Sequence, residues 1–363
     1  MKFDESVLSG TEKLVNSLKS LYVKYGYRQY RMSKFEEYAL YGRNIDFLVS
    51  DSVITFTDTD GKLMALKPDV TLSIVKNDRD DNTTVNKVCY NENVYRVSKG
   101  TGAFKEIMQS GIECIGDVDV CLVGEVLSLA SKSLEATGEK YVLEVSHLGL
   151  LSLAVGKITG EPGLRNRIMK CVSEKNIHGI SELCRDNSID ADAAAPLVSL
   201  VSLYGKPSKV LEKIKEIDLG EEGKEALSEF SLALSVFDGD AACDSVQIDM
   251  SVTADENYYN GIVFKGFVEG VPESVLSGGQ YDRLMNKMGR RSRAVGFAVY
   301  LDALEMISSK VPEYDFDVML IYPDGMEPSE LRAETEKIVG SGRSVFCCKR
   351  PNDKIKCKET VRI

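Results

Sequence analysis

The segment Leu276-Ser277-Gly278-Gly279-Gln280-Tyr281-Asp282, followed closely by Val295-Gly296-Phe297-Ala298, decides the fold of this chain of 363 residues. Two other segments precede it: Leu66-Lys67-Pro68-Asp69-Val70-Thr71, and the stretch from Tyr95-Arg96 to Glu113. Glu113 lies on a predicted core strand, where a carboxylate needs either a salt-bridge partner or a ligand. The order and spacing of the three segments, more than any one of them, indicate a shared binding site.

Antiparallel strands are expected around these segments. The runs 53–56 and 63–66 flank Asp60-Gly61, a turn signal that predicts a β-hairpin. Apolar periodicity predicts a helix over 6–24, capped near Gly26, and a long helix after Asp117 that packs on the sheet. Further strands are expected at 87–90, 94–97, 111–115, 141–145, 247–251 and 261–268, and a strand that leads into a core helix at 292–307.

The chain divides into a large domain and a small C-terminal piece. Residues 1–310 form the large domain, and a stretch at about 162–240, rich in Leu, Ala, Glu and Lys, predicts a helical insertion within it. Pro312 marks the boundary. In 313–363 a β-α-β order is at most half of an ordinary small α/β domain. The predicted fold class is α+β, with an antiparallel sheet flanked by helices.

The composition excludes several classes of protein. A net charge of −11 and a pI near 5.0 argue against a nucleic-acid-binding protein, since phosphate contacts require clustered Lys and Arg. A local excess of cations between Arg343 and Arg362 is consistent with a solvated face or a partner-docking edge. No apolar run could span a bilayer, and the N-terminus lacks the layout of a signal peptide. We therefore expect a cytoplasmic protein.

The nine cysteines are scattered without a C-x-x-C pair, and the chain has two histidines. This pattern argues against a disulfide framework and against a zinc site. We expect no metal, and we expect nearly all the thiols to be buried as small apolar groups.

Together the three segments resemble the catalytic domain of histidyl-tRNA synthetase, a class II aminoacyl-tRNA synthetase, over roughly residues 1–310. In that family the counterpart of Leu66 to Thr71 holds the α-amino group of histidine, and an arginine bridges the substrate carboxylate and the ATP α-phosphate. A second ligand for the amino group and an acid that faces the imidazole follow, and two tyrosines complete the pocket. The resemblance implies a histidine site made of Asp69, Thr71, Arg96, Gln109, Glu113, Tyr259 and Tyr281.

The implied site is chemically sensible for histidine. A buried ammonium group needs an ionised acceptor, which Asp69 supplies with a shorter reach than the Glu usual in the family. A carboxylate opposite the imidazole, here Glu113, pairs with an N–H that aliphatic side chains lack. A core salt bridge remains an alternative role for Glu113. Tyr258 is expected to belong to the core rather than to the site.

The ATP-handling residues of the family are absent from this chain. Ser98 and Ala103 stand where an acidic and a basic residue are expected, in a loop that is one residue shorter. The histidine-specific signature reads Ala254-Asp255-Glu256-Asn257-Tyr258-Tyr259, with Ala254 in place of an arginine. In the last motif Ala303 replaces the arginine of the γ-phosphate, and Tyr300 replaces a small glycine. Loss of these cations should abolish formation of an adenylate.

Two departures concern architecture. Ser33 stands near the place of the proline that shapes the dimer interface of the family; the dimer interface is still expected, without this proline. The C-terminal piece is much shorter than an anticodon-binding domain, which makes recognition of tRNA doubtful.

These losses and retentions resemble the regulatory subunits of ATP phosphoribosyltransferase. That resemblance implies no catalysis and no cofactor of its own, histidine as ligand, a short-form catalytic subunit as partner, and a homodimer within a hetero-octamer. Three alternatives remain open: a divergent histidine-tRNA ligase, a histidine-binding or interaction module with another partner, and an amide ligase for another amino acid. The last is disfavoured by Glu113 together with Tyr259.

Overall fold

The computed structural model describes residues 8–44, 53–78, 83–98, 101–254, 258–308 and 313–363. It divides into two compact units, Met1–Ser308 and Ser309–Ile363, each described here by itself. Asp255, Glu256 and Asn257 of the signature segment, and the first residues of the predicted first helix, lie outside the described residues.

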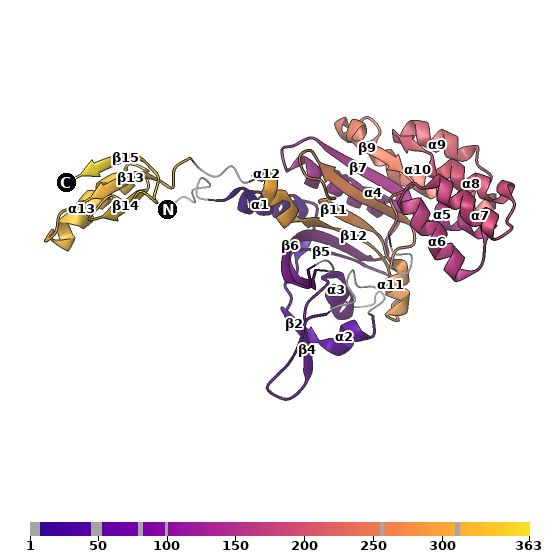
Figure 1. Ribbon diagram of the computed structural model, residues 1–363, viewed down its shortest axis with the longest axis horizontal. Coiled ribbons are helices and arrows are strands. Elements are labelled where there is room, and N and C mark those ends of the chain that lie inside the picture. The colour runs from indigo at the N-terminus through magenta and orange to yellow at the C-terminus, as the bar shows by residue number, and fades with distance from the viewer. Residues whose placement is uncertain (1–7, 45–52, 79–82, 99–100, 255–257, 309–312) are drawn as a thin grey trace. The chain divides into compact units, whose positions relative to one another are not determined.

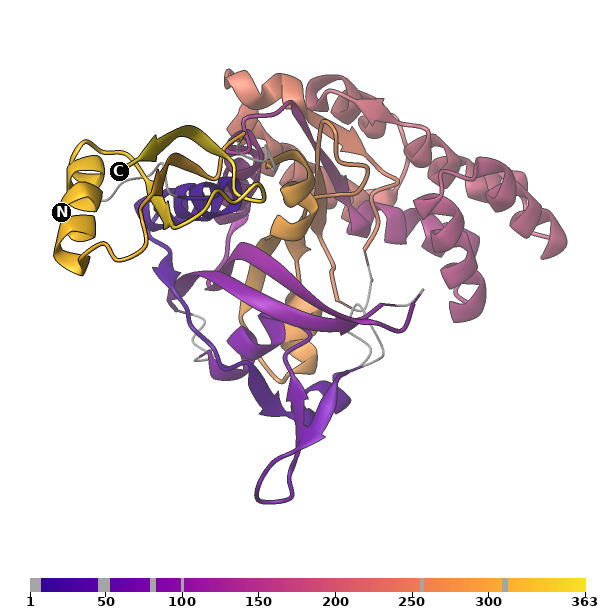
Figure 2. The ribbon, with the colours of Figure 1, turned by 60° about the vertical axis from the view of Figure 1, so that its left-hand side comes forward.

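The first unit is built on a nine-stranded mixed sheet (Figure 1). Neighbouring strands are antiparallel except at the pairs β1–β5 and β7–β9, which lie near the two edges. The two longest strands, β5 and β6, form one hairpin that crosses the front of Figure 2. In spatial order the strands are β1 Arg28–Gln29, β5 Val85–Val97, β6 Phe104–Gly116, β12 Arg293–Tyr300, β11 Leu276–Gln280, β10 Ile262–Val268, β7 Tyr141–His147, β9 Val246–Asp249 and β8 Tyr204–Gly205.

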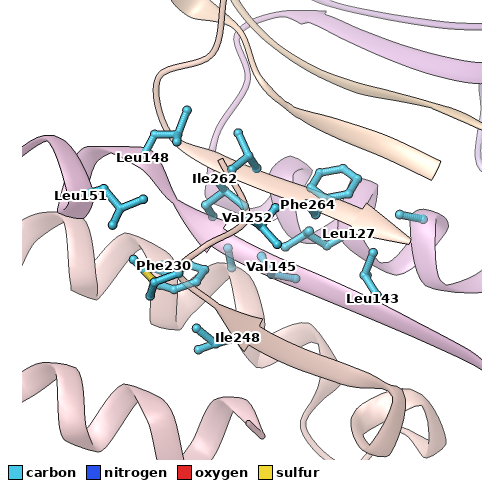
Figure 3. Packing of buried hydrophobic residues seen from close by; sticks show 14 of the residues in the cluster. Leu127, Leu143, Val145, Leu148, Leu151, Phe230, Ile248, Val252, Ile262 and Phe264 are labelled. Atoms are coloured by element: carbon cyan, nitrogen blue, oxygen red, sulfur yellow. The ribbon is translucent and has the colours of Figure 1, made fainter. Parts of the chain in front are cut away.

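Helices cover one face of this sheet. α1 (Gly10–Lys24), α4 (Val120–Glu135) and α12 (Leu301–Ser308) pack there, and the apolar stripe of α4 is buried. Figure 3 shows Leu127 of α4 close to Val145 and Phe264 of the sheet. Glycines let the central strands approach each other closely. A Cβ atom at Gly278 would lie 2.4 Å from the carbonyl oxygen of Gly296, which is too close for any side chain. The strand of the deciding segment, β11, lies in the middle of the sheet, and the segment ends at the start of α11.

A group of helices follows β7 and lies at the β7–β9 end of the sheet (Figures 1 and 2). The stretch expected as a helical insertion, 162–240, holds α6 to α10 and also the two-residue strand β8, which the sequence did not indicate. Phe230 joins this group to the main core. The helices are α5 Leu148–Ile158, α6 Pro162–Ser173, α7 Ile177–Asp186, α8 Ala191–Val201, α9 Pro207–Lys215 and α10 Gly220–Leu234, followed by short 3₁₀ turns at Ser235–Phe237 and Ala241–Ser245.

A second, small sheet lies beside the β5–β6 hairpin and consists of β2 (Phe35–Glu37), β4 (Leu63–Leu66) and β3 (Thr55–Thr57). The predicted hairpin around Asp60-Gly61 is confirmed, with Gly61 at a φ of +82°. Three short helices pack nearby: α2 Tyr38–Gly42, α3 Thr71–Asn77 and α11 Asp282–Lys287. The hairpin leads through β4 directly into Pro68-Asp69 and α3.

The C-terminal unit is a three-stranded parallel sheet with one helix. Its strands, in the spatial order β14, β13, β15, are Val345–Cys348, Phe316–Ile321 and Cys357–Arg362, and α13 spans Pro328–Gly340. The cation-rich stretch from Arg343 to Arg362 contains β14 and β15, and the sequence analysis did not predict β15. Three of its cations make local ion pairs: Arg343 with Glu359, Lys349 with Asp324 and Lys358 with Asp317.

None of the helices in the described part of the chain is long and apolar enough to cross a bilayer. All nine cysteines are free thiols. Cys89, Cys114 and Cys184 are buried, whereas the other six are partly or fully exposed, so the expectation that nearly all are buried is wrong.

The start of α1 gives a first testable prediction. Ser9 Oγ accepts a hydrogen bond from the Glu12 backbone N–H at 3.2 Å, and Glu12 Oε2 accepts one from the Ser9 N–H at 2.8 Å. Ser9→Ala removes half of this capping box and should lower the free energy of unfolding by about 1 kcal/mol in urea titration. Ser17→Ala, within the same helix, is the control and should change it by less than about 0.5 kcal/mol.

Candidate functional site

One cavity of about 180 Å³ in the first unit brings together all seven residues of the expected histidine site. They come from segments far apart in the sequence: the turn before α3, the strands β5 and β6, and the two ends of the β10–β11 region. The seven are Asp69, Thr71, Arg96, Gln109, Glu113, Tyr259 and Tyr281.

Strand register explains how Glu113 enters the cavity. Glu113 of β6 pairs directly with Gly296 of β12. A Cβ at Gly296 would lie 1.8 Å from Glu113 Oε2, so a glycine is required for the carboxyl group to lie over β12. The glycine of the Val295–Ala298 segment thus makes room for an acid from the neighbouring strand.

The Glu113 carboxyl group is buried and held by two hydroxyl groups. Thr71 donates from Oγ1 to Oε1, and Tyr281 donates from its OH to Oε2, both at 2.6 Å. Burial raises the pKa of Glu113 to about 8, although the two hydroxyl donors act in the opposite direction and nearby Asp69 raises it further. No cation of the described residues lies within 4.0 Å of it, so the core salt bridge considered above is not formed.

Asp69 lies at the start of α3, where its Oδ1 accepts a hydrogen bond of 2.8 Å from the Leu72 backbone N–H. Burial raises the pKa of Asp69, while this hydrogen bond and the charge of Arg96 lower it. Arg96 itself donates from Nε to the Pro68 carbonyl oxygen at 3.1 Å. The cavity therefore holds two acids that burial destabilises in their charged form, which favours a ligand that carries cations or N–H donors.

Several cavity residues were missed by the sequence analysis. Tyr90, Ser277, Ala298 and Tyr300 also line the cavity. Tyr258 was assigned to the core; it is buried there, but it lines the cavity as well and its ring centroid lies 4.5 Å from that of Tyr259. For Ala298 and Tyr300 the sequence did offer a signal. Both lie two residues apart on β12, in line with Gly296, and residues two apart on a strand share one face.

The three positions where cations of the family are lost, Ala103, Ala254 and Ala303, and the position of the lost acid, Ser98, lie away from the cavity lining. Ser98 and Ala103 close the tip of the β5–β6 hairpin, where Ser98 N donates to Ala103 O at 2.9 Å. Ala254 and Ala303 pack against the main core. Among the described residues that line the cavity, Arg96 is the one cation. In the described part of the chain, no group of three or more His, Cys, Asp or Glu side chains could hold a metal ion.

A buried ion pair supports the Pro68-Asp69 turn. The side chain of Lys67 is fully buried, and its Nζ lies 2.9 Å from Glu92 Oε2 in β5. The Tyr95 N–H donates to the Lys67 carbonyl oxygen at 2.9 Å. Both contacts attach the segment that carries Asp69 to the strand that carries Arg96.

Replacing Glu92 by Gln should therefore reduce stability. The change leaves a hydrogen-bond acceptor but removes the charge opposite a buried ammonium group, with an expected loss of about 1–3 kcal/mol in the free energy of unfolding. Glu37→Gln is a matched control, because the Glu37–Lys62 pair is exposed and 3.8 Å long. It should have an effect close to zero. Equal effects of the two variants in urea titration would contradict the supporting role of the Lys67–Glu92 pair.

Comparison with known proteins agrees with the fold. A family model described as histidyl-tRNA synthetase matches residues 4–304. The chain is 27% identical over 288 residues to the ATP phosphoribosyltransferase regulatory subunit of Alkaliphilus metalliredigens. The matched region covers 78% of this chain and 73% of that protein.

Two solved structures are similar in fold. The ATP phosphoribosyltransferase regulatory subunit/histidyl-tRNA synthetase of Bacillus halodurans has a TM-score of 0.83 at 21% identity, with 100% of this chain and 99% of that chain covered. A chain of the ATP phosphoribosyl transferase (HisG:HisZ) complex of Thermotoga maritima has a TM-score of 0.63 at 20% identity, with 83% and 98% covered. The predicted α+β, class II synthetase-like fold is confirmed. The chain belongs to the histidyl-tRNA synthetase family and, within it, is similar to the regulatory subunits of ATP phosphoribosyltransferase.

Proposed function

We propose that this chain is a regulatory subunit of ATP phosphoribosyltransferase in histidine biosynthesis, and that it binds histidine without activating it. The observation that carries the proposal is the imbalance of charge in the cavity. Asp69 and Glu113 suit a ligand with an ammonium group and an imidazole, whereas Arg96 is the one cation among the described lining residues.

Histidine matches this set of groups. Its α-ammonium group would pair with Asp69 and donate to Gln109, and its α-carboxylate would pair with Arg96. The imidazole N–H would donate to Glu113, whose orientation is fixed by the hydroxyls of Thr71 and Tyr281. Tyr259 would pack against the ring. An aliphatic amino acid would leave the buried Glu113 without a donor, which selects against it.

ATP does not match this set. Enzymes that transfer phosphoryl or nucleotidyl groups surround the phosphates with several cations or metal ions, because charge develops on the phosphate oxygens. One guanidinium group cannot balance the charge of a triphosphate, least of all beside the acids Asp69 and Glu113. The family cations lost at Ala103, Ala254 and Ala303 are consistent with this conclusion, and we propose that the chain catalyses no reaction itself.

The partner would be a catalytic subunit of ATP phosphoribosyltransferase. The name of the Alkaliphilus relative and the composition of the Thermotoga complex support this assignment. We further propose a short-form catalytic subunit, and a homodimer of this chain within a hetero-octamer. Histidine would inhibit by binding one state of the complex more tightly than the other, and its effect cannot exceed that difference in affinity.

Reconstitution tests the proposal. The purified chain is mixed with a short-form catalytic subunit, and phosphoribosyl transfer to ATP is measured with and without histidine. We expect turnover that requires the mixture and that histidine inhibits. Absence of a complex and of turnover would contradict the proposal and would favour an interaction module with another partner.

The family itself supports a second candidate, a histidine-tRNA ligase with a rebuilt ATP site. This enzyme would exchange pyrophosphate into ATP in a histidine-dependent reaction. We expect no such exchange from the purified chain. Exchange with a different amino acid would instead favour an amide ligase, and exchange with histidine would favour the tRNA ligase.

A further inference from the structure

The charges of the cavity indicate where an anionic part of a ligand lies. A charged Asp69 repels it, and Arg96 is the one cation among the described residues of the lining. The Arg96 guanidinium is restrained by its Nε hydrogen bond to Pro68 O, at 3.1 Å. An anionic ligand group therefore pairs with Arg96, and the cavity around Arg96 decides what can be attached to that group.

One wall of the cavity is graded in side-chain size. Gly296, Ala298 and Tyr300 alternate along β12, so they share one face of the strand, and all three line the cavity. Gly296 leaves space for Glu113, as described above, and Ala298 adds only a methyl group. Tyr300 ends the strand with a full phenol ring, and its backbone N–H is fixed to Val275 O at 2.8 Å. Along this wall the side chains therefore become larger from Gly296, next to Glu113, to Tyr300.

Tyr300 lies at the same end as Arg96. It pairs in register with Gln109, which also lines the cavity. Burial raises the pKa of Tyr300 and the charge of Asp69 raises it further, while the positive charge of Arg96 and the Ser277 side chain lower it. Arg96 and Ser277 line the same cavity as Tyr300, so the phenol ring and the guanidinium group face one space. A ligand carboxylate that pairs with Arg96 has the Tyr300 ring as its neighbour.

We propose that Tyr300 sets the length of the ligand: it closes the Arg96 end of the cavity, so that the site accepts a free α-carboxylate and excludes amino acids whose carboxylate carries a further group, such as an acyl adenylate. This assignment rests on the proposed histidine site and adds a steric reason to the electrostatic one. The cavity volume of about 180 Å³ suits a free amino acid, and a nucleotide ester paired through Arg96 would have to extend past the Tyr300 ring.

The test compares two ligands on three proteins by calorimetry. The ligands are L-histidine and histidyl sulfamoyl adenosine, a stable adenylate analogue that keeps a negative charge next to the carbonyl group. The proteins are the wild type, Tyr300→Ala and Tyr300→Phe. The wild type should bind histidine and bind the analogue at least about 100-fold more weakly. Tyr300→Ala should gain at least about 10-fold for the analogue and keep histidine within about fivefold, and Tyr300→Phe, which keeps the ring, should behave as the wild type.

The outcomes separate this inference from the proposed function. Equal binding of both ligands by the wild type, or a folded Tyr300→Ala that binds histidine but gains nothing for the analogue, would overturn the role of Tyr300 alone. A wild type that binds no histidine would overturn the proposed site and this inference together. Thermal unfolding of each variant establishes that it is folded.

Discussion

Replacing Asp69 by Asn is expected to weaken histidine binding by about 100- to 1,000-fold, or about 3–4 kcal/mol. The change removes the negative charge opposite the ligand's ammonium group inside the cavity. The ammonium group would then be desolvated without an ionised acceptor, which is far less favourable than remaining in water. Calorimetric titration with L-histidine measures the loss directly.

The Asn variant is chosen because it separates binding from folding. Its side-chain oxygen can still accept the hydrogen bond that Leu72 N–H donates to Asp69 Oδ1 at 2.8 Å, so α3 should start as before. Asp58→Asn is the matched control, because Asp58 also accepts backbone N–H groups, from Asp60 and Lys62, but lies outside the cavity lining. An Asp69→Asn protein that binds histidine within about threefold of the wild type would contradict the site.

Glu113 should make the stability of the empty chain fall as the pH rises. The pKa of Glu113 is about 8 in the folded chain, against an ordinary value of 4.5, because burial disfavours the carboxylate. Between these two values the folded chain holds a proton that the unfolded chain has released. The stabilisation is fully present below pH 4.5 and is lost as the pH rises through 8, at about 1.4 kcal/mol per pH unit.

Glu113→Gln should remove this dependence, because the amide does not titrate. Above pH 8 the variant should exceed the wild type in free energy of unfolding by about 3–5 kcal/mol, and the difference should shrink toward acidic pH. Glu225→Gln, an exposed position in α10, should leave the slope of the wild type in place. Urea titrations at several values of pH between 5 and 9 measure the slopes. Parallel curves for Glu113→Gln and the wild type would show that Glu113 is not the titrating group.

Local signals predicted much of the fold. Asp60-Gly61 predicted its hairpin because a short turn with glycine in the left-handed region, here Gly61 at a φ of +82°, restricts the backbone strongly. Gly26 was expected to cap α1 and has a φ of +86°, which favours glycine. The stripe after Asp117 predicted α4, whose N-cap is Asp119. In each case the information lies within a few residues of the feature.

Features that depend on distant partners were missed. The predicted strands at 87–90 and 94–97 are parts of one strand, β5, because pairing with all of β6 overrides the polar residues Asn91 to Asn93. Strand β15 looked like a charged tail, and it is a strand because β13 pairs with it in parallel.

The same distinction holds for the site. The resemblance to the family predicted seven residues that line one cavity. It did not predict that the hydroxyls of Thr71 and Tyr281 both bind Glu113, because these two residues are 210 positions apart and only the folded chain brings them together. Tyr258 was assigned to the core because an aromatic residue looks alike in a core and in a pocket wall. Its position on the cavity lining follows from packing alone.

The central claim is that the cavity binds histidine but not the phosphates of ATP. Calorimetric titration of the purified wild-type chain with L-histidine, repeated in the presence of Mg²⁺-ATP, tests it most directly. We predict saturable binding of histidine with an affinity that ATP leaves unchanged, and no heat from ATP alone. Absence of histidine binding, or histidine-dependent binding of ATP, would contradict the account.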